Sequence, residues 1–172
     1  MSTVMGEALA AAGRVMVGYG ELLAADIPAG DFGKRPTGGV ETNTPAWVYG
    51  HLSIYPERAL AMLGRESAAI DAGHLEANFG ARSECADDPD GSVYGPKEAL
   101  VRRFMERHAV LMDELATVDE GVFAEPNPNE QMRSRFPTKG AAAAFYVGGH
   151  AMMHLGQVSA WRRVMGLGPA MK

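Results

Sequence analysis

Two histidines near the end of the chain, His150 and His154, lie four residues apart in the segment GGHAMMHLGQVSAWRRVMG. Residues at this spacing project from the same face of an α-helix. Two imidazoles on one helical face can bind a single divalent metal ion, but the spacing alone fits two packed core histidines equally well. The pair is therefore a candidate metal site that needs a further ligand.

His51 is the candidate for that further ligand. It lies between Trp47 and Tyr55 on the apolar side of another predicted helix, where an unpaired polar ring costs roughly 1–3 kcal/mol. Three inward-facing histidines are explained more simply as ligands of one ion than as three separate buried polar groups. Three neutral imidazoles leave a coordination position open for water or substrate, which is typical of catalytic rather than structural zinc sites.

Four predicted helices must position these histidines. Apolar residues recur at spacings of three and four over residues 3–25, 44–64, 96–118 and 138–165. In the second helix, Thr44 followed by Pro45 is typical of an N-terminus, since the hydroxyl accepts from a free backbone N–H and proline loses no bond there. Pro56 should kink this helix one turn beyond His51 or end it early.

The pattern of these segments indicates the fold class. No stretch alternates apolar and polar residues as a strand would, and Pro, Gly and Asp gather in long connections between the helices. One connection, the acidic stretch 65–95, is predicted to hold a short helix around 66–79. We therefore predict an all-α protein, a four-helix bundle with long crossover connections, in a single domain over residues 1–172.

The composition argues against two classes of partner. The net charge is -5 and the Lys and Arg residues are scattered, whereas nucleic-acid-binding proteins gather positive charge on one face. No apolar run approaches the roughly 18 residues that cross a membrane. Glu7 and Arg14 interrupt what would have to be a signal-peptide core. We expect a cytoplasmic protein with neither nucleic acid nor membrane as its partner.

The segment TPAWVYGHL, followed far downstream by HAMMHLGQVSAWRRVMGLG, resembles the DinB-like superfamily of metal-dependent enzymes, of the DinB/YfiT type. Members of this superfamily are four-helix bundles with one histidine on the second helix and an H-x-x-x-H pair on the last. The resemblance implies that His51, His150 and His154 are the metal ligands here. It also implies a divalent metal ion, zinc or nickel, and a homodimer.

The resemblance does not name one reaction. It implies a hydrolase or a thiol-dependent transferase acting on a small molecule, with a low-molecular-weight thiol as the partner in the second case. The alternative is a non-catalytic bundle or dimerisation module whose metal site is structural or vacant. No acidic residue lies in the immediate turn of the ligands, unlike in H-E-x-x-H proteases, so the sequence identifies no general base.

Four other residues carry weaker expectations. His108 lies on the apolar seam of the third helix, which fits a packed histidine and leaves a fourth ligand as the alternative. Cys85, in the acidic segment SECADDPDG, is expected to be exposed and unreactive. Arg58, on the His51 face, is either a steering group for an anionic substrate or a solvated arginine. Arg162 is expected to stabilise the end of the last helix.

Overall fold

The computed structural model describes residues 3–37 and 40–171, and the regular structure of these residues is helical. The α-helices are α1 (Val4–Ala25), α2 (Pro45–Leu52), α3 (Tyr55–Met62), α4 (Glu76–Phe79), α5 (Lys97–Leu115), α6 (Glu120–Ala124), α7 (Lys139–Ala144) and α8 (Ala151–Val164). A π-helical segment, η4 (Phe145–His150), joins α7 to α8. The predicted all-α fold is confirmed.

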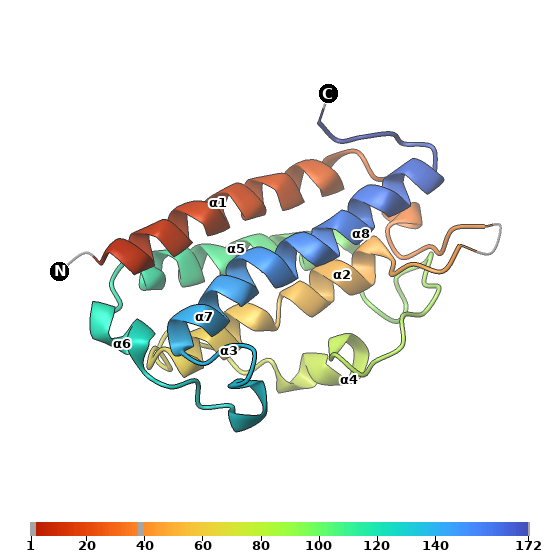
Figure 1. The fold of residues 1–172 in the computed structure, drawn as a ribbon. Helices are drawn as coiled ribbons and strands as arrows, with labels where there is room; N and C mark the ends of the chain where they lie inside the picture. Colours follow the sequence, from red (N-terminus) through yellow and green to blue (C-terminus); the bar gives the residue numbers. More distant parts are fainter. Residues whose placement is uncertain (1–2, 38–39, 172) are drawn as a thin grey trace.

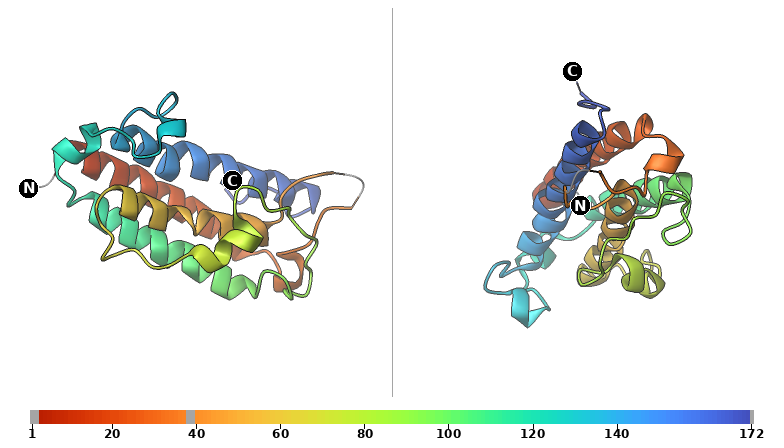
Figure 2. Two further views of the ribbon diagram at one scale, coloured as in Figure 1. Left: turned by 90° about the horizontal axis from the view of Figure 1, so that it is seen from below. Right: turned by 90° about the vertical axis from the view of Figure 1, so that its right-hand side faces the viewer.

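The long helices surround an apolar interior that holds two clusters of buried residues. α1 packs against α5 and α8, and α2 packs against the same two helices (Figure 1). The connection over residues 63–96 returns along the bundle, so that α2, α3 and α5 run in the same direction (Figure 2). This is a crossover connection of the predicted kind. The second predicted helix is divided into α2 and α3, whereas the fourth stays continuous through the π-helical segment.

The second predicted helix is broken where Pro56 indicated a break. The Thr44 side chain caps α2 by accepting from the backbone N–H of Trp47 at 3.3 Å. The helix ends at Leu52, and α3 begins at Tyr55. The prediction of an early end is confirmed, because proline cannot donate to the turn before it. The break leaves His51 in the last turn of α2.

The predicted helix over 138–165 is confirmed as continuous helical backbone from Lys139 to Val164, but its middle is not α-helical. Residues Phe145–His150 form a π-helical turn between α7 and α8. Such a turn holds an extra residue, so it rotates the side chains that precede it relative to those that follow. The period of apolar residues does not reveal this change. His150 is the last residue of the turn.

The short helices also depart from the predictions. Of the helix expected around 66–79, only Glu76–Phe79 is α-helical, preceded by a 3-10 turn over Gly73–Leu75. Helix α6 was not predicted, because its five residues are too few to show a period. Both elements lie in long connections, where contacts with the bundle rather than local pattern decide the backbone.

Cys85 is buried, and the expectation that it is exposed was wrong. Its thiol sulfur accepts from the backbone N–H of Thr44 at 3.3 Å, next to the cap of α2. Asp88, also buried, accepts from the backbone N–H groups of Val93 and Tyr94 at 3.1 and 2.8 Å. The Cys85 bond holds the acidic loop against the start of α2, and the Asp88 bonds fold the loop on itself, which its polar composition does not indicate.

Helix α1 shows which of its predicted apolar positions face the core. Leu9, Met16 and Leu23 are buried, whereas Val15 and Leu22 are 75% and 49% exposed. The apolar residues whose spacing predicted this helix therefore do not all face the core. By length and composition alone, α1 could cross a membrane, since an 18-residue window of it has a mean hydropathy of 1.2. In the structure, 33% of that window is buried. Core helices pass the same test, so the lack of a membrane partner stays a prediction.

Arg162 has a different role from the one expected. Its guanidinium is buried, pairs with the carboxylate of Asp26 and donates to the carbonyl of Leu23 at 2.9 Å. These contacts hold the end of α8 against the end of α1. The sequence pattern could suggest a role at the helix terminus but could not reveal a partner more than a hundred residues away.

His108 is a packed core histidine. Its Nδ1–H donates to the carbonyl of Phe104 at 2.8 Å, and the two rings lie 4.4 Å apart. Burial lowers the pKa of His108 from 6.5 to about 4. The ring is therefore neutral in the folded protein at neutral pH.

This pKa predicts an acid dependence of stability. Because the folded pKa is below the unfolded one, the unfolded state binds more protons between pH 6.5 and about 4. Stability is fully present above pH 6.5 and falls as the pH drops through this window. In His108→Leu, the free energy of unfolding should fall less steeply, by up to about 1.4 kcal/mol per pH unit. Urea unfolding at several pH values measures both slopes, and equal slopes would contradict the prediction.

Candidate metal centre

The structure brings the three predicted histidines together. His51 comes from the end of α2, His150 from the end of η4 and His154 from the first turns of α8. One ring nitrogen from each lies within 4.8 Å of the others, and all three side chains are buried. The Nε2 atoms of His51 and His150 are 3.3 Å apart. Their role as metal ligands stays a prediction.

Two of the rings are held from behind by oxygen acceptors. His51 Nδ1–H donates to the backbone carbonyl of Phe79 at 2.6 Å. His154 Nδ1–H donates to Oε1 of Gln157 at 2.9 Å, and the same oxygen accepts from the amide of Asn43 at 3.2 Å. Because the acceptors fix the proton on Nδ1, the Nε2 lone pairs are left free.

A glycine allows the first of these acceptors to reach its place. A Cβ at Gly50 would overlap the Phe79 ring, so a larger residue would push α4 away from α2. With glycine, the ring packs directly on α2, and the Phe79 carbonyl lies within bonding distance of His51. The pairing of α4 with α2 thus positions one candidate ligand.

The donor set fits a divalent cation. Two nitrogen ligands at about 2.0–2.1 Å from a tetrahedral ion are separated by about 3.3–3.4 Å, and the His51 and His150 Nε2 atoms are 3.3 Å apart. Without an ion, two lone pairs face each other, or His150 donates from Nε2 and leaves its Nδ1 an unsatisfied acceptor. Nδ1 of His150 is buried and has no hydrogen-bond partner. A cation between the rings removes the conflict at Nε2.

The rings have the protonation state that metal binding requires. Burial lowers the pKa of His51 to about 4 and that of His150 to about 3, with a further contribution from the neighbouring imidazoles. Burial also lowers the pKa of His154. All three are neutral at pH 7, so a metal ion does not have to displace a proton from them.

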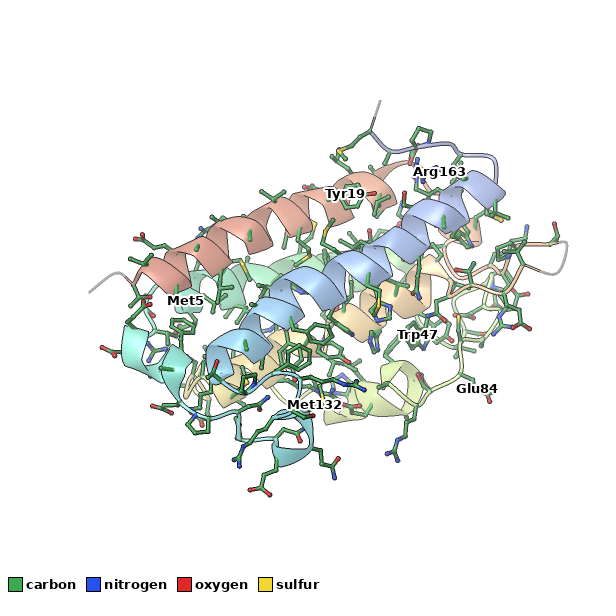
Figure 3. All side chains as sticks on the ribbon, viewed as in Figure 1. Met5, Tyr19, Trp47, Glu84, Met132 and Arg163 are labelled. Atoms are coloured by element: carbon green, nitrogen blue, oxygen red, sulfur yellow. The ribbon has the colours of Figure 1, made fainter. Side chains whose placement is uncertain are left out.

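Aromatic rings enclose the cluster on two sides. The Trp47 ring stacks on His51 at 4.5 Å and 13°, and its indole N–H donates to Ser83 Oγ at 2.9 Å. In Figure 3, Trp47 lies below α8, on the side of α4. On the other side, the Tyr55 ring lies 4.0 Å from His150 and 5.3 Å from Tyr146. The walls are apolar rings, with hydroxyl groups only at the two tyrosines.

Arg58 lies on the solvent side of this wall. Its guanidinium is 5.0 Å from the Tyr55 ring centroid and donates to Glu76 at 2.5 Å. Its side chain is 41% exposed. The structure thus places Arg58 beside the cluster, as the sequence interpretation required, and steering of a substrate stays a prediction.

A comparison with known protein families supports the resemblance that the histidine motifs suggested. A family profile described as the DinB superfamily matches residues 21–158. The chain belongs to the DinB superfamily. The matched range holds α2, the crossover, α5 and all three histidines, so the predicted DinB resemblance is confirmed. No curated protein and no solved structure matches this DinB-superfamily chain significantly.

Gln157 lies in the segment that carries His150 and His154, but sequence reasoning did not assign it a role. A glutamine three residues after His154 lies over the same face of α8, which is a signal for a partner of the imidazole. The other acceptor, the Phe79 carbonyl, gives no such signal because any residue type carries one. Of the histidines outside the cluster, His108 is in the core and His74 is exposed.

The Gln157 contact predicts a loss of metal affinity in Gln157→Leu. Without Oε1, His154 loses the acceptor that fixes its tautomer and ring orientation, and zinc affinity should fall about 10–100-fold. Competition with a chromophoric chelator measures this change. Asn43→Leu is the matched control, since it removes only the second bond to Oε1 and should cost less. Unchanged zinc affinity in Gln157→Leu would show that this bond does not position the ring.

Proposed function

We propose that this protein is a metal-dependent enzyme in which His51, His150 and His154 hold a divalent ion, zinc or nickel. The reaction is of the hydrolase or thiol-dependent transferase type, and the substrate is a small molecule, with a low-molecular-weight thiol in the transferase case. The observation that carries the proposal is the 3.3 Å separation of two facing Nε2 atoms in a buried cluster of three neutral imidazoles.

A bound divalent ion would supply a Lewis acid with a position open to a ligand. The chain itself contributes orientation and burial. The bonds behind His51 and His154 hold their rings in place, and Trp47 and Tyr55 cover them from two sides. Burial raises the pKa of Tyr55, so its hydroxyl stays protonated and can donate to a substrate oxygen.

The metal content of the purified protein tests the proposal. Protein prepared without added metal or chelator should hold near one equivalent of zinc or nickel by mass spectrometry. His150→Ala should hold close to none, because two imidazoles bind such an ion far more weakly than three. His74→Ala, which changes an exposed histidine, is the control and should match the wild type. Stoichiometric metal in His150→Ala would contradict the assignment.

A homodimer and a cytoplasmic location also remain proposals. The family resemblance implies the homodimer. Support comes from the exposed apolar residues Val15, Leu22 and Met152, which with Tyr19 and Met171 line a groove of about 500 Å³ on neighbouring faces of α1 and α8. A second copy of the chain would cover these residues. The location rests on composition alone.

A further inference from the structure

A small pocket lies beside the histidine cluster, outside the rings that could hold the ion. Its volume is about 370 Å³, which suits one part of a small-molecule ligand. It is lined by Arg58, Glu76, Ala77, Gly80, Ala81, Arg82 and Ser83. These residues belong to α3, to α4 and to the loop that follows α4.

Two sides of the pocket touch the walls of the cluster. Ser83 accepts from the indole N–H of Trp47, and that indole stacks on His51. Arg58 lies over the Tyr55 ring. The centroid of this ring is 5.0 Å from that of His51 and 4.0 Å from that of His150. Each side of the pocket is thus one aromatic ring away from a candidate ligand.

The pocket carries a net positive charge. Two guanidinium groups and one carboxylate line it, which leaves one positive charge in excess. Arg58 gives one of its five N–H donors to Glu76. Among the described residues, Arg82 makes no hydrogen bond or ion pair, and it is exposed. The pocket therefore holds free guanidinium donors in a solvent-accessible place.

A larger cavity on the other side of Ser83 lacks this property. Its volume is about 780 Å³, and Glu41 and Glu84 outnumber the single arginine, Arg35. The Arg35 guanidinium already donates to the carbonyl of Cys85. An anion is therefore favoured in the smaller pocket and disfavoured in the larger one.

We infer that the pocket formed by Arg58 and Arg82 binds a carboxylate group of the substrate. The inference rests on the proposed function, in which the reactive end of the same substrate binds at the ion. Three imidazole ligands carry no charge, so an ion held by them keeps its positive charge and favours an anionic donor such as a thiolate. Guanidinium groups match a carboxylate in shape, and one excess charge matches one carboxylate better than a dianionic phosphate.

Thiol binding to the cobalt-loaded protein tests the inference. The thiolate-to-cobalt absorption band gives affinities for mercaptohexanoate, which carries one carboxylate at the end of its chain, and for mercaptohexanol, which has the same chain and no carboxylate. Mercaptohexanoate should bind about 10-fold more tightly, the equivalent of one charge-assisted hydrogen bond. The double variant Arg58→Gln/Arg82→Gln should lose this preference while it keeps its cobalt. Arg35→Gln, in the other cavity, is the control and should keep the preference.

The outcomes separate the two proposals. If cobalt and both thiols bind but the preference is absent, or survives in the double variant, the carboxylate pocket is wrong and the metal site stands. If cobalt does not bind, the proposed function fails and the inference fails with it. A second readout needs no metal: acetate, which carries a single carboxylate, should shift the Arg58 and Arg82 Nε–H resonances of the metal-free protein at lower concentration than phosphate does. Equal response to phosphate, or none to acetate, would overturn the assignment to a carboxylate.

Discussion

The candidate site depends on two hydrogen bonds made behind the imidazole rings. His51 gives its Nδ1 proton to the Phe79 carbonyl, and His154 gives its own to Gln157. Each bond fixes a tautomer and a ring orientation together, so the Nε2 lone pairs are directed into the cluster before any ion arrives. Two further contacts support these bonds. Gly50 lets α4 approach α2, and Asn43 donates to the Gln157 amide oxygen.

Both helices that carry the histidines are irregular at the site. α2 ends at Leu52, one residue after His51, and the π-helical turn ends at His150. In a regular α-helix the backbone N–H groups are hydrogen-bonded within the helix. Irregular turns have poorer hydrogen-bond geometry, which packing must offset. Here the departures place Tyr55 and Tyr146 against each other beside the cluster. The irregular backbone therefore shapes the wall that faces a substrate.

Local signals made much of this site predictable. The cap at Thr44, the break before Pro56 and the shared face of His150 and His154 each depend on residues within a few positions of one another. They locate the helices and show which face carries the imidazoles. The convergence of His51 with the pair could be predicted because apolar faces of a bundle must meet in one core.

Long-range pairings were beyond such reasoning. The burial of Cys85, the pairing of Arg162 with Asp26 and the acceptor at Phe79 join residues between 28 and 136 positions apart. In each case a polar group is satisfied by a partner from a distant part of the sequence, and such a pairing leaves no periodic signal in either segment. The π-helical turn was missed for another reason, since its sequence is compatible with an α-helix.

X-ray absorption spectroscopy of the zinc-loaded protein tests the central claim most directly, because it measures the ligands themselves. The account predicts three imidazole nitrogens at about 2.0–2.1 Å, with the scattering pattern of rigid rings, and one further light atom. A shell with a thiolate sulfur would contradict it, and Cys85, the single cysteine of the sequence, is the residue that could supply one. So would a shell of oxygen atoms with fewer than three imidazoles, because the ion would then not be held by His51, His150 and His154.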